Sequence, residues 1–285
     1  MSDRFKSVFI GLYPVLVMAV VLKSLLALNA NPMQLVWWGA LATSAPMMAL
    51  FMRLMILKDL ARTSKSLPVL SSLALVGFAL ALYAWSERGE PQTGLVFAAA
   101  GFAGFMLYNF WYSNYGRTPS DLITVGQPLP EFTVQEADGA QVPSASFTDQ
   151  PALILFYRGN WCPLCMAQID ELAALHRDFE DLGIQIILIS PQPPRFSAKL
   201  AKRHSLNFRF LADRDGAAAR DLKLLVRNGL PLGLGLLGYA TDTVYPTVIM
   251  TDAGGRVIFA DQTDNYRVRP EPDTYLRIYR ETLAG

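Results

Sequence analysis

The sequence predicts two domains, an all-α domain of four membrane-spanning helices followed by a soluble α/β domain. The chain has 285 residues, of which 52% are hydrophobic and only 17% are charged, whereas about 25% of the residues in a typical soluble domain are charged. Residues 1–116 contain eight basic and four acidic residues, and residues 117–285 contain 17 and 20. This composition excludes a disordered chain, and the lack of a strong basic excess predicts no nucleic-acid partner.

The first 116 residues contain four apolar stretches, each close to the roughly 20 residues that a helix needs to cross a bilayer. They are Val8–Leu28, Leu35–Leu57, Leu67–Trp85 and Gly94–Tyr112. Lys23 and Arg53 lie near the ends of two stretches, where a long side chain can reach the membrane surface. A buried bundle in a soluble protein is the alternative, but four such stretches in succession favour a transmembrane domain over residues 1–116.

Charges in the loops predict the orientation in the bilayer. The N-terminal segment and the second loop contain Arg4, Lys6, Lys58, Arg62 and Lys65. The first loop has no charge, and the third has Arg88 as its only cation. Positive residues favour the cytoplasmic side, so we expect a multi-pass protein of the cell (inner) membrane with a cytoplasmic C-terminal domain. If the first stretch were a cleaved signal peptide, three spans would remain and that domain would still face inward.

A stretch rich in Gly, Pro, Ser and Asn separates the two parts, so residues 117–130 are expected to be a linker and residues 131–285 the second domain. The predicted strands are 131–135, 152–157, 184–190, 208–211, 247–251 and 256–260. The predicted helices are 162–182, 196–204, 217–226 and 272–283. The strand–helix–strand order over 152–190 predicts parallel pairing of its two strands. Residues 229–239 are apolar and Gly-rich, and could line a pocket, dip into the bilayer or form a buried connection.

The only two cysteines of the chain are Cys162 and Cys165, in the sequence Trp161-Cys-Pro-Leu-Cys. At the start of a helix, where Pro163 suits the first turn, both sulfurs can meet in a small disulfide loop. Helix amides there lower the pKa of a thiol, and the resulting thiolate attacks a disulfide or a peroxide before the second thiol resolves the intermediate. This spacing predicts an oxidoreductase with catalytic Cys162 and Cys165, no cofactor and no metal. We expect the two sulfurs to lie within bonding reach and to be open to water.

Three other roles for the cysteines remain as alternatives. A structural disulfide is disfavoured on the cytoplasmic side, where thiols are kept reduced. A zinc site needs two further ligands, and His176 would lie about 16 Å from Cys165 along the same helix at roughly 1.5 Å per residue. Inert core thiols do not explain a proline between them.

Three segments resemble the thioredoxin-fold redoxins, and most closely the peroxiredoxin-like branch of the alkyl hydroperoxide reductase/thiol-specific antioxidant (AhpC/TSA) family. They are Gly126–Phe132, Phe156–Cys165 and Tyr245–Thr247. The resemblance covers residues 123–259 and implies a thioredoxin-like α/β fold for the C-terminal domain. It also implies that Cys162 is an exposed nucleophile, that Cys165 resolves, and that Pro246, after Tyr245, is a cis-proline facing the pair.

The sequence departs from that family at positions near the cysteines. Peroxiredoxins carry a proline seven residues and a threonine three residues before the reactive cysteine. In register with Cys165 these positions hold Arg158 and Cys162, and in register with Cys162 they hold Leu155 and Gly159, so neither register matches. Phe156 stands where thioredoxins have a buried acid. Arg158 could favour a nearby thiolate, or it could be a solvated residue at a strand end. Peroxide and disulfide substrates therefore both remain open.

Two functions follow from these observations. The first is a membrane-anchored thiol–disulfide redox protein that reduces disulfides or peroxides at the expense of a thiol reductant. The alternative is a redox-sensing domain that regulates its membrane domain or relays electrons to it. Channels and transporters usually carry acidic residues within their spans. The predicted spans carry only Lys23 and Arg53, which favours anchoring.

Overall fold

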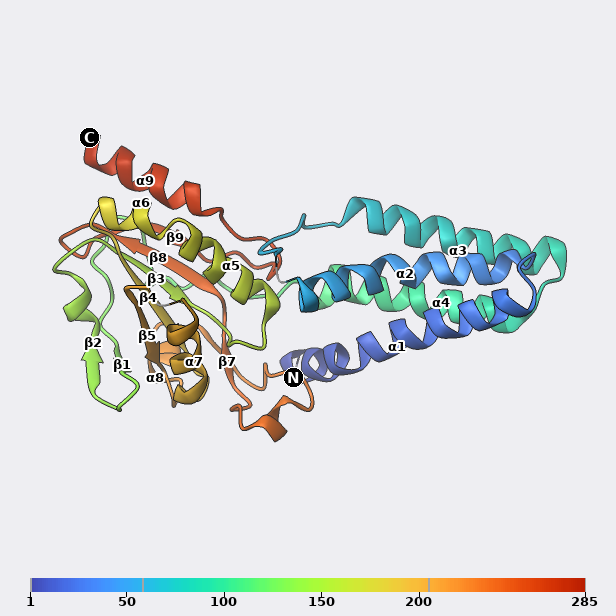
Figure 1. Ribbon diagram of the computed structural model, residues 1–285, viewed down its shortest axis with the longest axis horizontal. Helices are drawn as coiled ribbons and strands as arrows, with labels where there is room; N and C mark the ends of the chain where they lie inside the picture. The colour runs from blue at the N-terminus through green and yellow to red at the C-terminus, as the bar shows by residue number, and fades with distance from the viewer. Residues whose placement is uncertain (1, 58, 205, 285) are drawn as a thin grey trace. The chain divides into compact units, whose positions relative to one another are not determined.

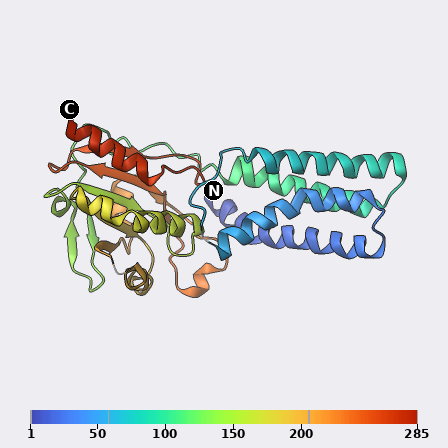
Figure 2. The same ribbon diagram turned by 45° about the horizontal axis from the view of Figure 1, so that its top comes forward.

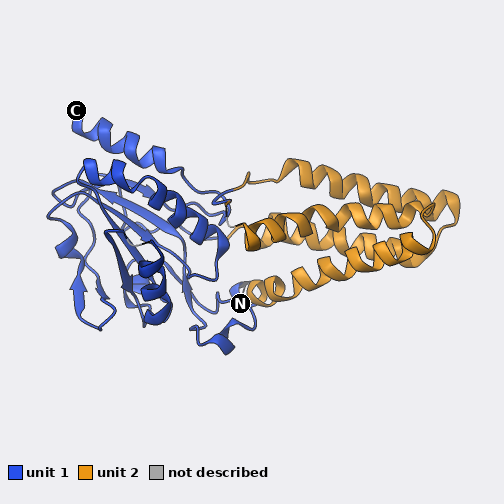
Figure 3. Cartoon of the chain, in the orientation of Figure 1, with its two compact units in different colours: residues 1–4, 60–62, 116–285 blue, residues 5–59, 63–115 orange. Residues whose placement is uncertain are grey.

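The computed structural model describes residues 2–57, 59–204 and 206–284, so Lys58 of the second loop lies outside the described residues. The chain forms two compact units (Figure 3). Residues 5–59 and 63–115 form the helical unit, which is described first and is unit 2 in Figure 3, and residues 1–4, 60–62 and 116–285 form the α/β unit, which is described second and is unit 1 in Figure 3.

The first unit is helical, and the four predicted spans are all helices. They are α1 (Ser2–Ala30), α2 (Leu35–Ile56), α3 (Pro68–Arg88) and α4 (Gln92–Met106), which continues as the π-helical turn Leu107–Tyr112. All four are long and apolar enough to cross a membrane, and only 22–39% of the most apolar part of each helix is buried. The helices approach closely where Gly39 faces Gly77, since a Cβ atom on Gly39 would lie 2.5 Å from the Gly77 carbonyl oxygen.

The second unit is built on a seven-stranded sheet in the order β2-β1-β5-β4-β3-β8-β9 (Figure 1). Its strands are β1 (Thr133–Gln135), β2 (Gln141–Pro143), β3 (Ala152–Phe156), β4 (Gln185–Ser190), β5 (Phe208–Ala212), β8 (Thr247–Thr251) and β9 (Val257–Asp261). Strands β3, β4 and β5 are parallel, and β8 runs antiparallel to β3. All five residues of β3 are buried, as a central strand covered on both faces requires. The parallel pairing predicted for the strand–helix–strand unit is therefore confirmed.

Helices cover both faces of this sheet (Figures 1 and 2). They are α5 (Pro163–Ala174), α6 (His176–Asp181), α7 (Pro194–His204), α8 (Ala217–Asp221) and α9 (Pro272–Ala284). Helix α8 packs into the core with Ile154 and Ile249. Tyr275 of α9 packs edge-on against Phe259 on the opposite face, and α5 lies on that same face because Gln168 donates a hydrogen bond to Tyr275 Oη over 3.3 Å. The arrangement is a thioredoxin-like α/β fold.

Two predicted helices differ from the structure. The predicted helix 162–182 is broken at Leu175, whose backbone leaves helical geometry (φ −103°, ψ 18°). His176 then begins α6, with its Nδ1 atom 2.9 Å from the Ala173 carbonyl oxygen. The predicted helix 217–226 ends at Asp221 because Lys223 adopts a left-handed backbone (φ +57°). The residues that follow form β6 (Leu225–Val226), which pairs with β7 (Thr243–Val244).

The segment predicted to be a linker, residues 117–130, packs against the end of the sheet. The Gly126 N–H donates to the Val257 carbonyl over 2.7 Å, and the Leu129 N–H donates to the Gly255 carbonyl over 2.8 Å. Ile123 is buried in the same core as β3. These contacts make the segment part of the α/β unit.

The apolar segment 229–239 lies between β6 and β7 and contains the short 3₁₀ helix Leu234–Leu237. Leu236 is 93% exposed, and Leu232 and Leu237 are 57% and 59% exposed. A buried connection, one of the three expectations for this segment, is therefore wrong, because three of its five leucines point outward.

Candidate active site

The two cysteines lie where β3 gives way to α5. Cys162 is the last residue before the helix and has an extended backbone (φ −90°, ψ 107°), and Pro163 occupies the first turn. Proline suits that position because its fixed φ is helical and the N–H it lacks would have no partner within the helix. Cys165 follows in the same turn, with its N–H donating to the Cys162 carbonyl over 3.1 Å. Both thiols therefore lie at the carboxyl end of a central parallel strand, where open α/β sheets commonly place their sites.

The Sγ atoms of Cys162 and Cys165 are 2.9 Å apart, and both residues are free thiols. The expected bonding reach is confirmed. The expected opening to water is not, since Cys162 is 2% and Cys165 0% exposed. Describing Cys162 as an exposed nucleophile was wrong, because its side chain turns inward toward Cys165 at the start of the helix.

The electrostatics of the pair favour a thiolate on Cys165. Burial by itself would raise the pKa of Cys165, but the hydrogen bond with Cys162, the charge of Arg269 and a backbone hydrogen bond from Arg158 lower it from 9.0 to about 5. The hydrogen bond with Cys165, together with burial, raises the pKa of Cys162 well above its ordinary value. These directions favour Cys165 as the ionised thiol, whereas the resemblance implies that Cys162 is the nucleophile and that Cys165 resolves.

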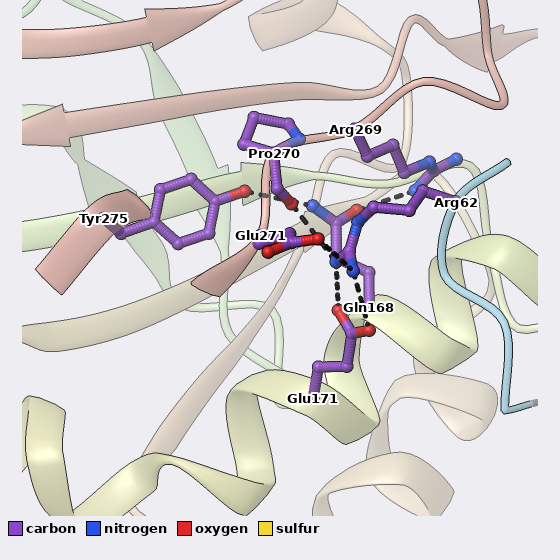
Figure 4. Close-up of polar contacts among 7 residues, drawn as sticks. All are labelled: Arg62, Gln168, Glu171, Arg269, Pro270, Glu271 and Tyr275. Carbon is purple, nitrogen blue, oxygen red and sulfur yellow. Dashed lines mark hydrogen bonds and ion pairs between the residues drawn. The ribbon is translucent and has the colours of Figure 1, made fainter. Parts of the chain in front are cut away.

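The guanidinium of Arg269 lies beside the sulfur of Cys165. Its Nη2 atom lies 3.5 Å from Cys165 Sγ, its Nη1 donates to Gln168 Oε1 over 2.7 Å, and its Nε donates to the Tyr266 carbonyl over 3.2 Å. Gln168 lies one turn after Cys165 on α5 and is 2% exposed. Figure 4 shows Gln168 between Arg269 and Tyr275. The helix that carries the thiolate thus also orients the guanidinium that stabilises it.

A second arginine, Arg62, also links α5 to the segment that carries Arg269. The guanidinium of Arg62 donates to the carboxylate of Glu171 on α5 and, over 3.3 Å, to the carbonyl of Pro270 (Figure 4). Arg62 belongs to the segment 60–62 of this unit. It therefore joins the helix of Cys165 to the residue that follows Arg269.

Most of the α/β unit matches a known protein family. The AhpC/TSA family model matches residues 125–260. The α/β unit carries an AhpC/TSA family domain. Peroxiredoxin Bcp of Escherichia coli K12 is 25% identical over 147 residues, which cover 50% of this chain and 90% of that protein. Peroxiredoxin Q of Gentiana triflora is 26% identical over 99 residues, which cover 35% of this chain and 46% of that protein.

Solved structures give similar matches. The crystal structure of peroxidoxin BcpB from Mycobacterium tuberculosis aligns with 21% identity and a TM-score of 0.45, covering 56% of this chain and 97% of that one. The peroxiredoxin-like resemblance inferred from the motifs is confirmed by the family model and the relatives.

Arg158 is part of the interior of the AhpC/TSA domain. It is 7% exposed, its guanidinium carbon lies 4.6 Å from the ring centroid of Trp161, and its Nη2 donates to the Gly229 carbonyl over 2.7 Å. A solvated residue at a strand end, one of the two expectations for Arg158, is therefore wrong. Its charge favours the thiolate form of Cys162, although the hydrogen bond to Cys165 and burial outweigh it.

The loop before the cysteines is held by a buried amide. Gln192 Oε1 accepts from the Asn160 N–H over 2.8 Å, and its Nε2 donates to Tyr157 Oη over 2.9 Å and to Ser197 Oγ over 3.0 Å. Burial, the largest cause, raises the pKa of Tyr157. This network fixes the loop and leaves the Tyr157 hydroxyl protonated.

Pro246 does not form the expected cis-proline. No peptide bond is cis in the part of the chain that the structure describes, so the Tyr245–Pro246 bond is trans. Trans is the lower-energy form by about 0.5–1 kcal/mol. Arg117 contacts both residues that precede β8. Its Nη1 donates to the Pro246 carbonyl over 3.2 Å, and its guanidinium carbon lies 4.8 Å from the Tyr245 ring centroid.

The sequence reasoning missed Arg269, Gln168 and Arg62. Helical spacing could have found Gln168, because a residue three positions after Cys165 lies on nearly the same face of α5. Arg269 and Arg62 lie in irregular segments far along the chain, and no local pattern marks them.

Proposed function

We propose that this protein is a membrane-anchored, peroxiredoxin-like oxidoreductase that reduces hydroperoxides with the thiolate of Cys165 and closes its cycle through a disulfide with Cys162. The proposal depends on the groups that surround the sulfur of Cys165. Cys165 has a lowered pKa, the guanidinium of Arg269 is 3.5 Å away and a second thiol is 2.9 Å away. The AhpC/TSA domain and the peroxiredoxin relatives support the same class of reaction.

The chemistry has three balanced steps. The Cys165 thiolate attacks the outer oxygen of ROOH, the O–O bond breaks, and ROH leaves after taking one proton, so that Cys165 becomes a sulfenic acid. The thiol of Cys162 then attacks that sulfur, an S–S bond forms, and water leaves. An external dithiol reduces the disulfide and restores both thiols.

The site favours a small peroxide over a protein disulfide. Exchange with a disulfide needs three sulfurs in line and an attacking thiolate that the partner can reach. The residue expected to attack in that mechanism, Cys162, has a raised pKa and is 2% exposed. A hydroperoxide needs only a narrow path, and Arg269 can polarise its oxygen as the O–O bond lengthens.

The helical unit supports anchoring in a lipid bilayer. A soluble bundle buries the apolar face of each helix, whereas here large side chains such as Leu26, Ile56 and Val76 are 64–69% exposed. The loop charges support a cytoplasmic position for the AhpC/TSA domain at the inner membrane, because positive loops favour that side. Protease added outside intact cells should leave the domain whole, and digestion there would overturn this orientation.

The reaction is tested on the full chain in detergent, with hydrogen peroxide consumption and insulin disulfide reduction assayed in parallel. Cys165→Ser should abolish peroxide consumption. Cys162→Ser should keep one fast turnover and then accumulate a sulfenic acid that dimedone labels at Cys165. Loss of that first turnover in Cys162→Ser, with retention in Cys165→Ser, would reverse the assigned roles. Insulin reduction without peroxide consumption by the unmodified chain would replace the proposal with disulfide exchange.

A further inference from the structure

The segment 229–239, here called the leucine segment, presents aliphatic side chains to the outside of the α/β unit. Leu232, Leu236 and Leu237 are all more than half exposed. From Asn228 to Thr241 the sequence contains no charged residue. Contiguous exposed apolar surface of this kind usually marks a site of interaction with a membrane or a partner.

The leucine segment is firmly attached at its base. Leu230 is buried, and its N–H donates to the Thr241 carbonyl over 3.0 Å. The ring of Tyr239 stacks on Phe196 of α7 with centroids 4.7 Å apart, and Arg195 Nη2 donates to the Leu237 carbonyl over 2.9 Å. The exposed leucines therefore project from a fixed base beside α7.

Helix α7 adds positive charge next to these leucines. Its exposed face carries Arg195, Lys199, Lys202 and Arg203, called here the basic stripe, and the helix contains no acidic residue. Successive members of the stripe are four, three and one residues apart, which places all four on one face of the helix. Arg203 also pairs with Asp170 over 3.1 Å, while Arg195 lies at the leucine segment itself.

We propose that the leucine segment and the basic stripe form a lipid-binding surface, in which the leucines enter the interface of an anionic bilayer and the stripe contacts its headgroups. Aliphatic side chains beside a row of cations match the two layers of that interface, since apolar residues reach the acyl boundary and lysines and arginines meet anionic headgroups. Protein interfaces are instead centred on aromatic residues and arginines. The three side chains of the leucine segment that are more than half exposed are all leucines.

This surface is directly connected to the loop that precedes the cysteines. The Gly229 carbonyl accepts from Arg158, and the Tyr239 hydroxyl donates to Asn160 Oδ1. Binding of the leucine segment to lipid would therefore bring the loop that precedes the cysteines close to the membrane surface. The proposal concerns binding and stands whether or not the site reduces peroxides.

A fluorescent reporter on the full chain tests it. Because the chain has only two cysteines, a background with Cys162→Ser and Cys165→Ser accepts one labelled cysteine at position 236 (Leu236→Cys), carrying a nitrobenzoxadiazole group. The matched control is Leu283→Cys in α9, a leucine that is 64% exposed. Both variants are reconstituted in vesicles of phosphatidylcholine with and without phosphatidylglycerol.

We expect spin-labelled lipid to quench the reporter at 236 several-fold more strongly than the one at 283, and more strongly with phosphatidylglycerol present. Lys199→Glu with Lys202→Glu should remove that dependence on anionic lipid. Equal quenching at both positions would overturn the proposal. Protection of position 236 from iodide without quenching by lipid would overturn it in favour of a protein partner. Leu232→Cys repeats the test if the first variant is unstable.

Discussion

The Nη2 atom of Arg269 lies 3.5 Å from the sulfur of Cys165, although the two residues are 104 positions apart in the chain. Both are buried, so water screens their attraction weakly. Gln168 accepts from the other side of the same guanidinium and limits its movement. The α/β unit thus folds a distant arginine over the first turn of α5, where its charge lowers the pKa of Cys165.

Arg269→Gln should slow the reaction of the reduced chain with hydrogen peroxide by about 10²-fold or more, because a donor aimed at the reacting atoms is worth that much. It should also move the pKa of Cys165 up toward the ordinary thiol value, since the neighbouring positive charge is lost. Stopped-flow kinetics and thiolate absorbance measure the two effects. Arg277→Gln, which removes an exposed arginine on α9, is the control. Equal rates in both variants would contradict this role for Arg269.

The two thiols should be alkylated in different pH ranges, Cys165 from mildly acidic pH upward and Cys162 only at high pH. The folded pKa of Cys165 is lowered to about 5, so its reactive thiolate is present above that value and is lost as the pH falls through it. The pKa of Cys162 is raised, so Cys162 should react only in strongly alkaline solution. Mass spectrometry of iodoacetamide-treated reduced chain resolves the two sites. A midpoint for Cys165 near 9 would show that Arg269 and Cys162 do not ionise it.

The sequence predicted well the features that depend on local patterns. The four predicted spans are helices, and the apolar runs 152–157 and 184–190 contain the buried strands β3 and β4, because an uninterrupted apolar run is typical of such elements. The cysteine pair was found because both residues share one helical turn. The end of the predicted helix 217–226 was missed because a left-handed Lys223 leaves no signature in the sequence.

The roles within the site could not be predicted from the same patterns. Which thiol ionises depends on Arg269, which tertiary folding brings to Cys165, and on the direction in which Cys162 turns. The cis-proline was expected from the resemblance alone. In the structure this bond is trans, and Arg117, 129 positions earlier in the chain, donates to the Pro246 carbonyl.

Arg62 and Glu171 should stabilise the site as a pair. Arg62→Met and Glu171→Gln should each lower the thermal midpoint slightly, and the double variant should lower it by less than the sum of the two. A coupling free energy of about 1 kcal/mol is expected for a partly exposed ion pair that is joined by two hydrogen bonds. Each variant should also raise the pKa of Cys165 modestly, because the segment carrying Arg269 loses its tie to α5 through Pro270. Full additivity in the double variant would show that the pair is not coupled.

Gly159→Ala should destabilise the loop that precedes the cysteines. Gly159 has φ +144°, and an added Cβ atom would lie 2.7 Å from Trp161 Nε1. The backbone strain and the displaced indole should together lower the free energy of unfolding by about 1–3 kcal/mol. Because Arg158 stacks on the same indole, the displacement should open the site and increase the rate at which Cys165 is alkylated at neutral pH.

The matched control for this change is Gly254→Ala in the β8–β9 turn, where an added Cβ atom has Asp252 Oδ1 at 3.5 Å as its neighbour. That contact is ordinary, so the thermal midpoint and the alkylation rate should stay close to those of the unmodified chain. If Gly159→Ala behaved like this control, the glycine would not be needed to keep the indole in place. The closed form of the site would then have to depend on the hydrogen bonds of Gln192, which Gln192→Leu removes and the same alkylation assay would test.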